Sequence, residues 1–306
     1  MIHEYALDPA VLASWASNRR DYAEFLREYG IGTPRLISSF PRKKATKLRS
    51  YLLSKCPINR QSLASQRYEE MVQKIVESVI VREVDDVELA EWQEKVVLEN
   101  NRVSFDVILL ITEIQEENAV TLETMYSQGS IWNHPNQINV SRTNKDLLNA
   151  VMNLVRLSTE RIVIIDPYGW TDEAISFIQF MLQSININRV SGGLPTVTLF
   201  YKEKRGGSGR GSPSASHVKQ AVTQGLAPEL SDLKLEVIEL SETCNTDVFH
   251  NRYVLTEHGG VGIGHGIGVS GNGIQTDEIY LVTGDIYRKK WNQFIEKNCF
   301  QLISAA

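Results

Sequence analysis

The sequence predicts an α/β protein. A helical N-terminal region, residues 1–104, is expected to precede an α/β domain, residues 105–306, built on a mixed, largely parallel sheet with helices on both faces. Two patterns indicate this division. Apolar residues recur at helical spacing through the first hundred residues. Beyond residue 105, short apolar runs alternate with helical segments, which is typical of βαβ units. The length is sufficient for two domains of ordinary size.

The N-terminal region is expected to consist of helices. Asp8 and Pro9 resemble a helix start, with a side chain that can cap the first turn and a proline that tolerates it. The segment from Gly30 to Pro34 is rich in residues that end helices. The segments expected to be helical are 11–29, the stretch between Pro41 and Cys56, 62–79 and 84–100.

The remaining chain is expected to alternate between strands and helices. The apolar run 106–111 indicates a buried strand, and no regular pattern covers 113–140. Helices are expected at 144–158, 171–185 and 217–224, and strands at 161–166, 196–201 and 234–240. Residues 204–213 are rich in glycine and basic residues, and we expect a loop there.

Composition and charge narrow the class of protein. With 42% hydrophobic and 23% charged residues, the chain is expected to be soluble and globular. No apolar run has the roughly 18–20 residues that a membrane-spanning helix needs, and the N-terminus lacks the pattern of a signal peptide. The 3 cysteines are widely separated, which favours neither a disulfide framework nor a zinc site. A cytoplasmic protein without a metal or cofactor is the simplest expectation.

The net charge of −5 hides a segregation of charge. Between Arg35 and Arg60 the chain has eight basic residues and no acidic one, whereas acids predominate between Glu83 and Glu123. One interpretation is a basic patch that binds nucleic acid. The other is a pair of solvated helix faces that pair with each other or with partner proteins, and we favour this second interpretation.

The stretch from Val248 to Gly266 is the most informative part of the sequence. If it begins as a strand, alternate side chains face opposite sides, so His250 and Arg252 share one face. Arginine offers a fork of donors that matches two phosphate oxygens. Histidine can act as a nucleophile or carry a proton near neutral pH, and a carboxylate such as Glu257 could orient it. The glycines that follow allow backbone amides to approach a ligand closely.

This stretch resembles the signature of the phospholipase D superfamily, in which histidine, lysine and aspartate follow in a fixed order. His250 matches the histidine, Arg252 stands in place of the lysine, and Glu257 in place of the aspartate. Gly264-His265-Gly266 takes the place of the family's Gly-Ser element. The pattern is most similar to the divergent phospholipase-D-like domain at the C-terminus of MIT-domain-containing proteins, in which an element like Asp166-Pro167-Tyr168 ends the first strand.

The resemblance covers roughly residues 145–300 and implies a phosphate site. Asp166 and Tyr168 are expected at its rim. The residues expected to hold the phosphate are His250, Arg252, Gly264, His265 and Gly266. His258 and His265 lie in the glycine-rich turn, where either could protonate a leaving group, but their positions are more typical of loop or packing histidines. The start of the N-terminal region resembles uncharacterised bacterial proteins, some of them linked to phage defence.

Two functions remain open. Enzymes of the family need two such motifs, and this chain shows one, so catalysis would require a homodimer. In that case His250 would be the nucleophile of a phosphodiesterase or nuclease, Arg252 would clamp the phosphate and Glu257 would orient His250. The alternative is a non-catalytic module that binds a phosphate-bearing ligand, a nucleic acid or another phosphodiester, within a larger assembly of proteins such as an antiphage complex. The MIT-associated branch binds acidic ligands without catalysis, and the altered motif favours this alternative.

Overall fold

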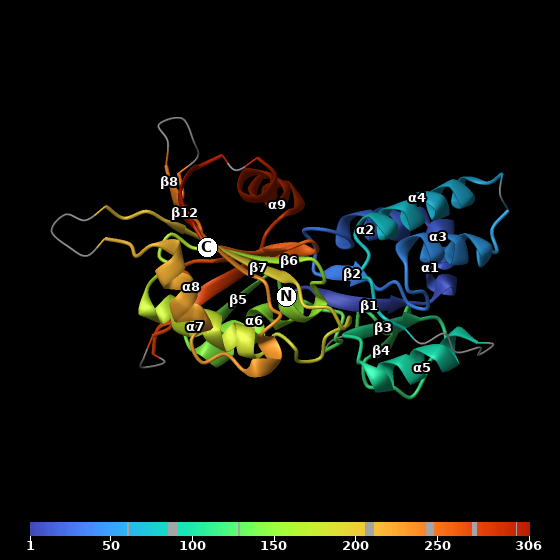
Figure 1. The fold of residues 1–306 in the computed structure, drawn as a ribbon. Helices are drawn as coiled ribbons and strands as arrows, with labels where there is room; N and C mark the ends of the chain where they lie inside the picture. The colour runs from blue at the N-terminus through green and yellow to red at the C-terminus, as the bar shows by residue number, and fades with distance from the viewer. Residues whose placement is uncertain are drawn as a thin grey trace. The chain divides into compact units, whose positions relative to one another are not determined.

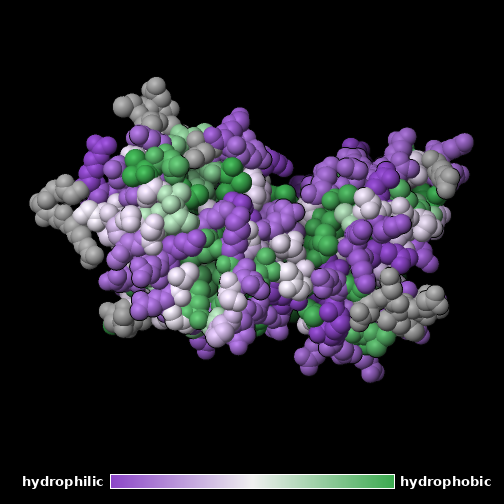
Figure 2. All heavy atoms as spheres, viewed as in Figure 1, coloured by the Kyte–Doolittle hydropathy of each residue, from purple (hydrophilic) through white to green (hydrophobic). Residues whose placement is uncertain are grey.

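A computed structural model describes residues 1–59, 61–84, 91–127, 129–205, 211–242, 248–270, 274–297 and 299–306. These residues form two compact units (Figure 1). The N-terminal unit comprises residues 2–135 and 188–192. The C-terminal unit comprises residues 136–187 and 193–306, together with Met1. No described helix is long and apolar enough to cross a membrane, and Figure 2 shows mainly hydrophilic side chains on the visible face of each unit.

The described part of the N-terminal unit contains a parallel sheet with strand order β2-β1-β3-β4. Its strands are β1 (His3–Leu7), β2 (Arg35–Ile37), β3 (Val107–Leu110) and β4 (Ala119–Thr121). Its helices are α1 (Pro9–Ser17), α2 (Arg19–Glu28), α3 (Ala45–Ser54), α4 (Leu63–Glu77) and α5 (Trp92–Arg102). The expectation of a purely helical region is therefore corrected: β1 and β2 are too short to show a clear pattern, and β1 is held by partners distant in sequence.

The start of α1 follows the sequence pattern, but the expected helix over 11–29 is interrupted. The Asp8 side chain caps α1 by accepting a hydrogen bond from the Ala10 N–H at 2.8 Å, and Pro9 occupies the first turn. Asn18 then leaves the helical conformation with an extended backbone, and its side chain caps α2 through the Arg20 N–H at 2.9 Å. Asn18 thus ends one helix and begins the next.

The expected boundary between residues 104 and 105 is also corrected. β3 pairs in parallel with β1, with Ile108 opposite Ala6, and all four β3 residues are buried. The stretch 105–135 therefore belongs to the N-terminal unit, and the division falls between residues 135 and 136. A buried apolar strand cannot leave the sheet that covers its apolar faces and satisfies its backbone hydrogen bonds.

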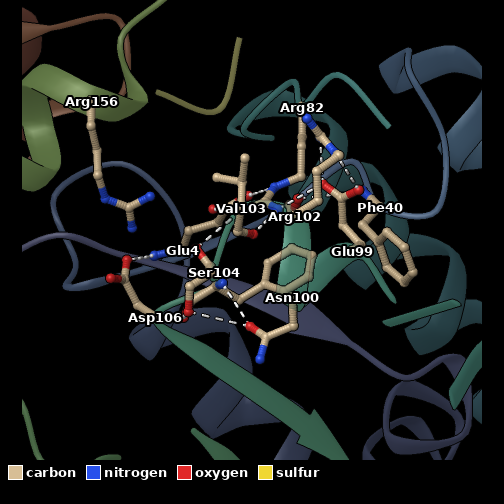
Figure 3. Close-up of polar contacts among 12 residues, drawn as sticks. Glu4, Phe40, Arg82, Glu99, Asn100, Arg102, Val103, Ser104, Asp106 and Arg156 are labelled. Carbon is tan, nitrogen blue, oxygen red and sulfur yellow. Dashed lines mark hydrogen bonds and ion pairs between the residues drawn. The ribbon is translucent and has the colours of Figure 1, made fainter. Parts of the chain in front are cut away.

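A fully buried arginine joins distant segments of the N-terminal unit (Figure 3). The Arg82 guanidinium donates to Glu4 at 2.8 and 2.9 Å and to Glu99 at 2.7 Å. It also lies 3.8 Å from the centre of the Phe105 ring. A buried charge is tolerated only when it is paired and hydrogen-bonded, as it is here. Glu99, one acid of the acidic stretch, is therefore buried as a partner of Arg82 and does not contribute to an acidic surface.

The described part of the C-terminal unit contains a mixed sheet with strand order β12-β8-β7-β6-β9-β10-β11-β5. The strands are β5 (Gln137–Ser141), β6 (Arg161–Ile165), β7 (Thr196–Lys202), β8 (Leu235–Ser241), β9 (Tyr253–Thr256), β10 (Gly259–Ile263), β11 (Thr276–Leu281) and β12 (Gln301–Ala305). The helical segments are α6 (Asn144–Leu157), α7 (Asp172–Gln183), α8 (Ala215–Thr223), the short η1 (Pro228–Leu230), α9 (Gly284–Trp291) and η2 (Asn292–Glu296).

The α/β class expected from the sequence is confirmed. The alternation of α6, β6, α7, β7, α8 and β8 follows the expected order, and Figure 1 shows α6, α7 and α8 on one side of the sheet and α9 on the other. Parallel pairing is confined to β6, β7 and β8, while the other described neighbours in this sheet are antiparallel. Only two residues separate β9 from β10, and so short a connection favours antiparallel pairing.

Candidate functional site

A cleft of about 570 Å³ lies in the C-terminal unit where β6 ends. Its walls come from the segment after β6, the start of α7, the segment after β10 and the residues that flank β5 and β11. The lining residues are Arg142, Asp166, Tyr168, Thr171, Glu173, Ala174, His265, Gly268, Val269, Ser270 and Gln275. The carboxyl ends of parallel strands are where α/β sheets commonly place ligand sites. Asp166 and Tyr168, which the sequence assigned to the rim, both line this cleft.

Asp166 ties the end of β6 to the segment after β10. It is 2% exposed, and its two carboxylate oxygens accept hydrogen bonds from the N–H groups of Tyr168 at 2.8 Å and Ile267 at 2.9 Å. Burial raises the pKa of Asp166, while these two N–H groups and the charges of Arg252 and Arg142 act in the opposite direction. Asp166 therefore positions the cleft wall as well as lining it.

Two glycines allow the segment after β10 to lie close to the carboxylates of Asp166 and Asp277. Gly266 has φ +93°, and a Cβ there would lie 2.4 Å from a carboxylate oxygen of Asp166. A Cβ at Gly264 would lie 2.7 Å from a carboxylate oxygen of Asp277. Both positions require glycine for close approach, and Gly266 also requires it for its backbone conformation.

Two arginines from separate segments lie in or beside the cleft: Arg142 lines it, and Arg252 lies next to the lining residue Tyr168. Arg252 donates to the Gly264 carbonyl at 3.3 Å, and its guanidinium lies 5.9 Å from the centre of the Tyr168 ring. Arg142 donates to the Gly268 carbonyl and, at 3.3 Å, to the Gln275 side-chain oxygen. These partners are neutral, and no described carboxylate forms an ion pair with either arginine. In both, Nε is buried without a hydrogen-bond partner among the described residues. Arg142 carried no signal in the sequence analysis.

His250 occupies a different position from the one expected. It is exposed, lies outside the strand and does not line the cleft. β9 begins only at Tyr253, which pairs with Ile165, the last residue of β6. The residues before Tyr253 therefore extend beyond the end of β6, and the expected strand face shared by His250 and Arg252 does not form. His250 lies instead near Glu242: burial raises the pKa of Glu242, but its pairing with Lys202 at 2.9 Å lowers it overall, and His250 acts in the same direction as Lys202.

Glu257 cannot orient His250, so the predicted role of this carboxylate is wrong. It lies after the far end of β9, where the strand pairs with the beginning of β6. Its oxygens accept hydrogen bonds from the N–H groups of Glu160 at 3.1 Å and Arg161 at 3.3 Å, and from the Ser158 hydroxyl at 2.9 Å. Glu257 therefore closes the turn between α6 and β6. His258 beside it is buried, as expected for a packing histidine.

His265 is paired with a buried carboxylate. Its Nδ1 lies 3.3 Å from Asp277, whose oxygens also accept the N–H of His265 at 2.9 and 3.0 Å. The His265 side chain is 72% exposed and lines the cleft, while that of Asp277 is fully buried. A carboxylate on Nδ1 fixes the tautomer of an imidazole and leaves Nε2 for a ligand or a proton. No local sequence pattern links His265 to Asp277, because Asp277 lies in another strand, β11.

The described residues contain no cluster of three or more histidine, cysteine, aspartate or glutamate side chains that could hold a metal ion. Residues 206–210 of the glycine-rich loop, Cys244, and Gly271 and Gly273 lie outside the described residues.

Comparisons with known proteins add little. No family model and no curated protein matches the sequence. Among solved structures, the chain is similar to a phospholipase D family member, Nuc from Salmonella typhimurium, with 9% identity and a TM-score of 0.35 over 56% of this chain and 99% of that chain. It is also similar to TrmBL2, an archaeal chromatin protein with a novel mode of DNA binding, with 12% identity and a TM-score of 0.29 over 97% of this chain and all of that chain. Scores this low assign neither a family nor a function.

Proposed function

We propose that the cleft at the end of β6 binds a phosphate-bearing ligand through Arg142, Arg252 and His265. The observation that carries this proposal is a pair of guanidinium groups, that of Arg142 in the cleft lining and that of Arg252 beside the lining residue Tyr168. Each is bonded to neutral oxygens, and each has a buried Nε without a hydrogen-bond partner among the described residues. Asp166 is the buried carboxylate whose electrostatic environment includes both arginines. Glu173 also lines the cleft, but it forms no ion pair with either arginine among the described residues, so both guanidinium groups keep donors for an anion.

Phosphate suits this arrangement chemically. Arginine donates in a planar fork that matches two phosphate oxygens. The volume of about 570 Å³ lies within the range of small-molecule sites. The likeness of residues 250–257 to the phospholipase D signature implies the same class of ligand, although the proposed site shares only Arg252 with that segment.

Binding can be tested with inorganic phosphate and a 5′-phosphorylated thymidine dinucleotide in a calorimetric titration. Arg142→Gln and Arg252→Gln are each expected to weaken binding about tenfold or more, because each removes a charge-assisted hydrogen bond. The control is Arg288→Gln on α9, because this side chain is 68% exposed and pairs with Asp285 on its own helix. Equal affinity in all three variants would contradict the proposal.

A second candidate function, hydrolysis of a phosphodiester, is favoured by the pairing of His265 with Asp277. In this reaction the His265 imidazole removes a proton from water as the water oxygen attacks phosphorus, and the departing alkoxide then takes up the proton. The pairing of a surface imidazole with a buried carboxylate is suited to a general base. Glu257 cannot support the corresponding role for His250.

Turnover of a chromogenic phosphodiester separates binding from catalysis. If the cleft hydrolyses its ligand, His265→Ala is expected to abolish turnover while weakening phosphate affinity less than Arg142→Gln does, and His250→Ala is expected to retain turnover. Loss of turnover only in His250→Ala would restore the homodimeric mechanism based on His250. No turnover by the wild-type chain would leave phosphate binding as the function.

A further inference from the structure

A second cleft, with a volume of about 530 Å³, lies in the N-terminal unit at the start of α3. Its lining includes four cationic side chains, Arg42, Lys43, Lys44 and Lys47. The basic run of the sequence therefore divides into two parts in the structure. Arg35 is buried, pairs with Glu28 at 2.9 Å and lies over the Trp132 ring, so it serves the interior. The cations from Arg42 to Lys47 surround a cleft instead.

The charges of these four cations are not neutralised by the described part of the chain. No described aspartate or glutamate forms an ion pair with any of them, and Lys43, Lys44 and Lys47 are exposed. Asp8 and Glu91 are the acids whose charges act on the neighbouring Tyr51 hydroxyl, yet neither pairs with the cluster. Like charges held around one hollow repel each other, and an anionic ligand relieves that repulsion.

The cleft is built on a helix that is anchored in the core. Leu48 and Leu52 bury one face of α3, while Lys47, Ser50 and Tyr51 line the cleft at helical spacing. The Arg42 guanidinium lies 4.8 Å from the centre of the half-buried Tyr51 ring, which holds this cation at the wall. Tyr51 therefore lines the cleft next to Leu52, which packs into the core.

We infer that this cleft binds the phosphate backbone of a nucleic-acid strand. Several cations around one hollow can contact successive phosphates, and an aromatic ring beside them is a feature of strand-binding grooves. A membrane surface is flat and cannot reach into a concave site, so we favour a strand over a lipid surface. The inference does not depend on the cleft at the end of β6, which uses different residues in the other unit.

The test is the salt dependence of binding of a fluorescent single-stranded oligothymidylate to the full chain. For a single strand, the slope of log affinity against log salt is about −0.7 for each phosphate neutralised. Lys44→Gln combined with Lys47→Gln is expected to weaken binding and to make this slope about 1.4 units less steep. The matched control is Arg49→Gln combined with Lys55→Gln, since both side chains are exposed cations of the same segment that do not line the cleft.

The same comparison in an Arg142→Gln, Arg252→Gln background keeps the two clefts separate. The difference between the two pairs of variants is expected to persist there, whether or not the cleft at the end of β6 binds phosphate. The inference would be overturned by an equal loss of affinity in both pairs of variants or by an unchanged salt slope. Binding to phosphatidylserine vesicles without binding to the oligonucleotide would also overturn it.

Discussion

At the scale of single residues, the candidate site depends on Gly266, which the sequence predicted as a phosphate-binding residue and the structure places against Asp166. Eight glycines lie between residues 259 and 273, and their number suggested a backbone that could approach a ligand. In the structure Gly266 instead allows the chain to approach its own Asp166 and Arg252. The close approach brings the Ile267 N–H to Asp166, and this contact shapes the cleft.

Gly266→Ala is expected to lower the free energy of unfolding and to weaken phosphate binding. A side chain at positive φ costs about 1–2 kcal/mol, and the new Cβ would also displace the Asp166 carboxylate. Gly225→Ala is the control, because Gly225 has a similar φ of +80° but open space around it. Urea unfolding should show a larger loss of unfolding free energy for Gly266→Ala than for Gly225→Ala. Equal losses would contradict the prediction that a Cβ at residue 266 displaces the Asp166 carboxylate.

At the scale of elements, the short strand β9 explains why the motif and the site differ. Arg252 precedes this strand and Glu257 follows it. Residues in a strand advance roughly 3.4 Å each, so the Cα atoms of Arg252 and Glu257 lie about 17 Å apart. In the sequence, the histidine, arginine and glutamate are close enough to form one motif. In the structure, Glu257 lies at the opposite end of β9 from Arg252. There it stabilises the connection between α6 and β6.

Glu257→Gln is expected to lower the free energy of unfolding by about 1–3 kcal/mol at pH 7, because the amide replaces an acceptor oxygen with a donor group. Phosphate binding should not change. Burial by itself would raise the pKa of Glu257, but His258 and the N–H groups around the carboxylate hold it below its usual value of 4.5.

The sign of the pH dependence follows from this lowered pKa. The stabilisation by ionised Glu257 is fully present above the unfolded-state pKa and is lost as the pH falls through the lower pKa of the folded state. The stability difference between wild type and Glu257→Gln should therefore shrink below about pH 4.5. A constant difference between pH 7 and pH 3 would contradict this account.

At the scale of the whole molecule, the N-terminal unit is held together by pairing between its first strand and a strand near its end. β1 pairs with β3, about one hundred residues later in the chain. A division at residue 105 would therefore cut one sheet in two, whereas a division at residue 136 leaves the described eight-stranded sheet intact.

Two fragments test this division. The fragment 136–306 is expected to unfold cooperatively on heating, because it keeps every described strand of its sheet. The fragment 105–306 carries β3 and β4 without β1, so it exposes a buried apolar strand and is expected to associate. Size-exclusion chromatography and thermal unfolding followed by circular dichroism would check both. A monomeric 105–306 fragment as stable as 136–306 would contradict the assigned division.

The sequence by itself determined those features that local patterns encode. The Asp8 cap, the alternation from α6 to β8 and the placement of Asp166 at the end of a parallel strand follow from side-chain periodicity, capping residues and apolar runs. Only the tertiary structure decided which residues meet at the cleft. Arg142, Arg252 and the pair of His265 and Asp277 come from separate segments, and strand pairing and register bring them together. Register depends on how complete strands bury their faces, and a local pattern does not contain that information.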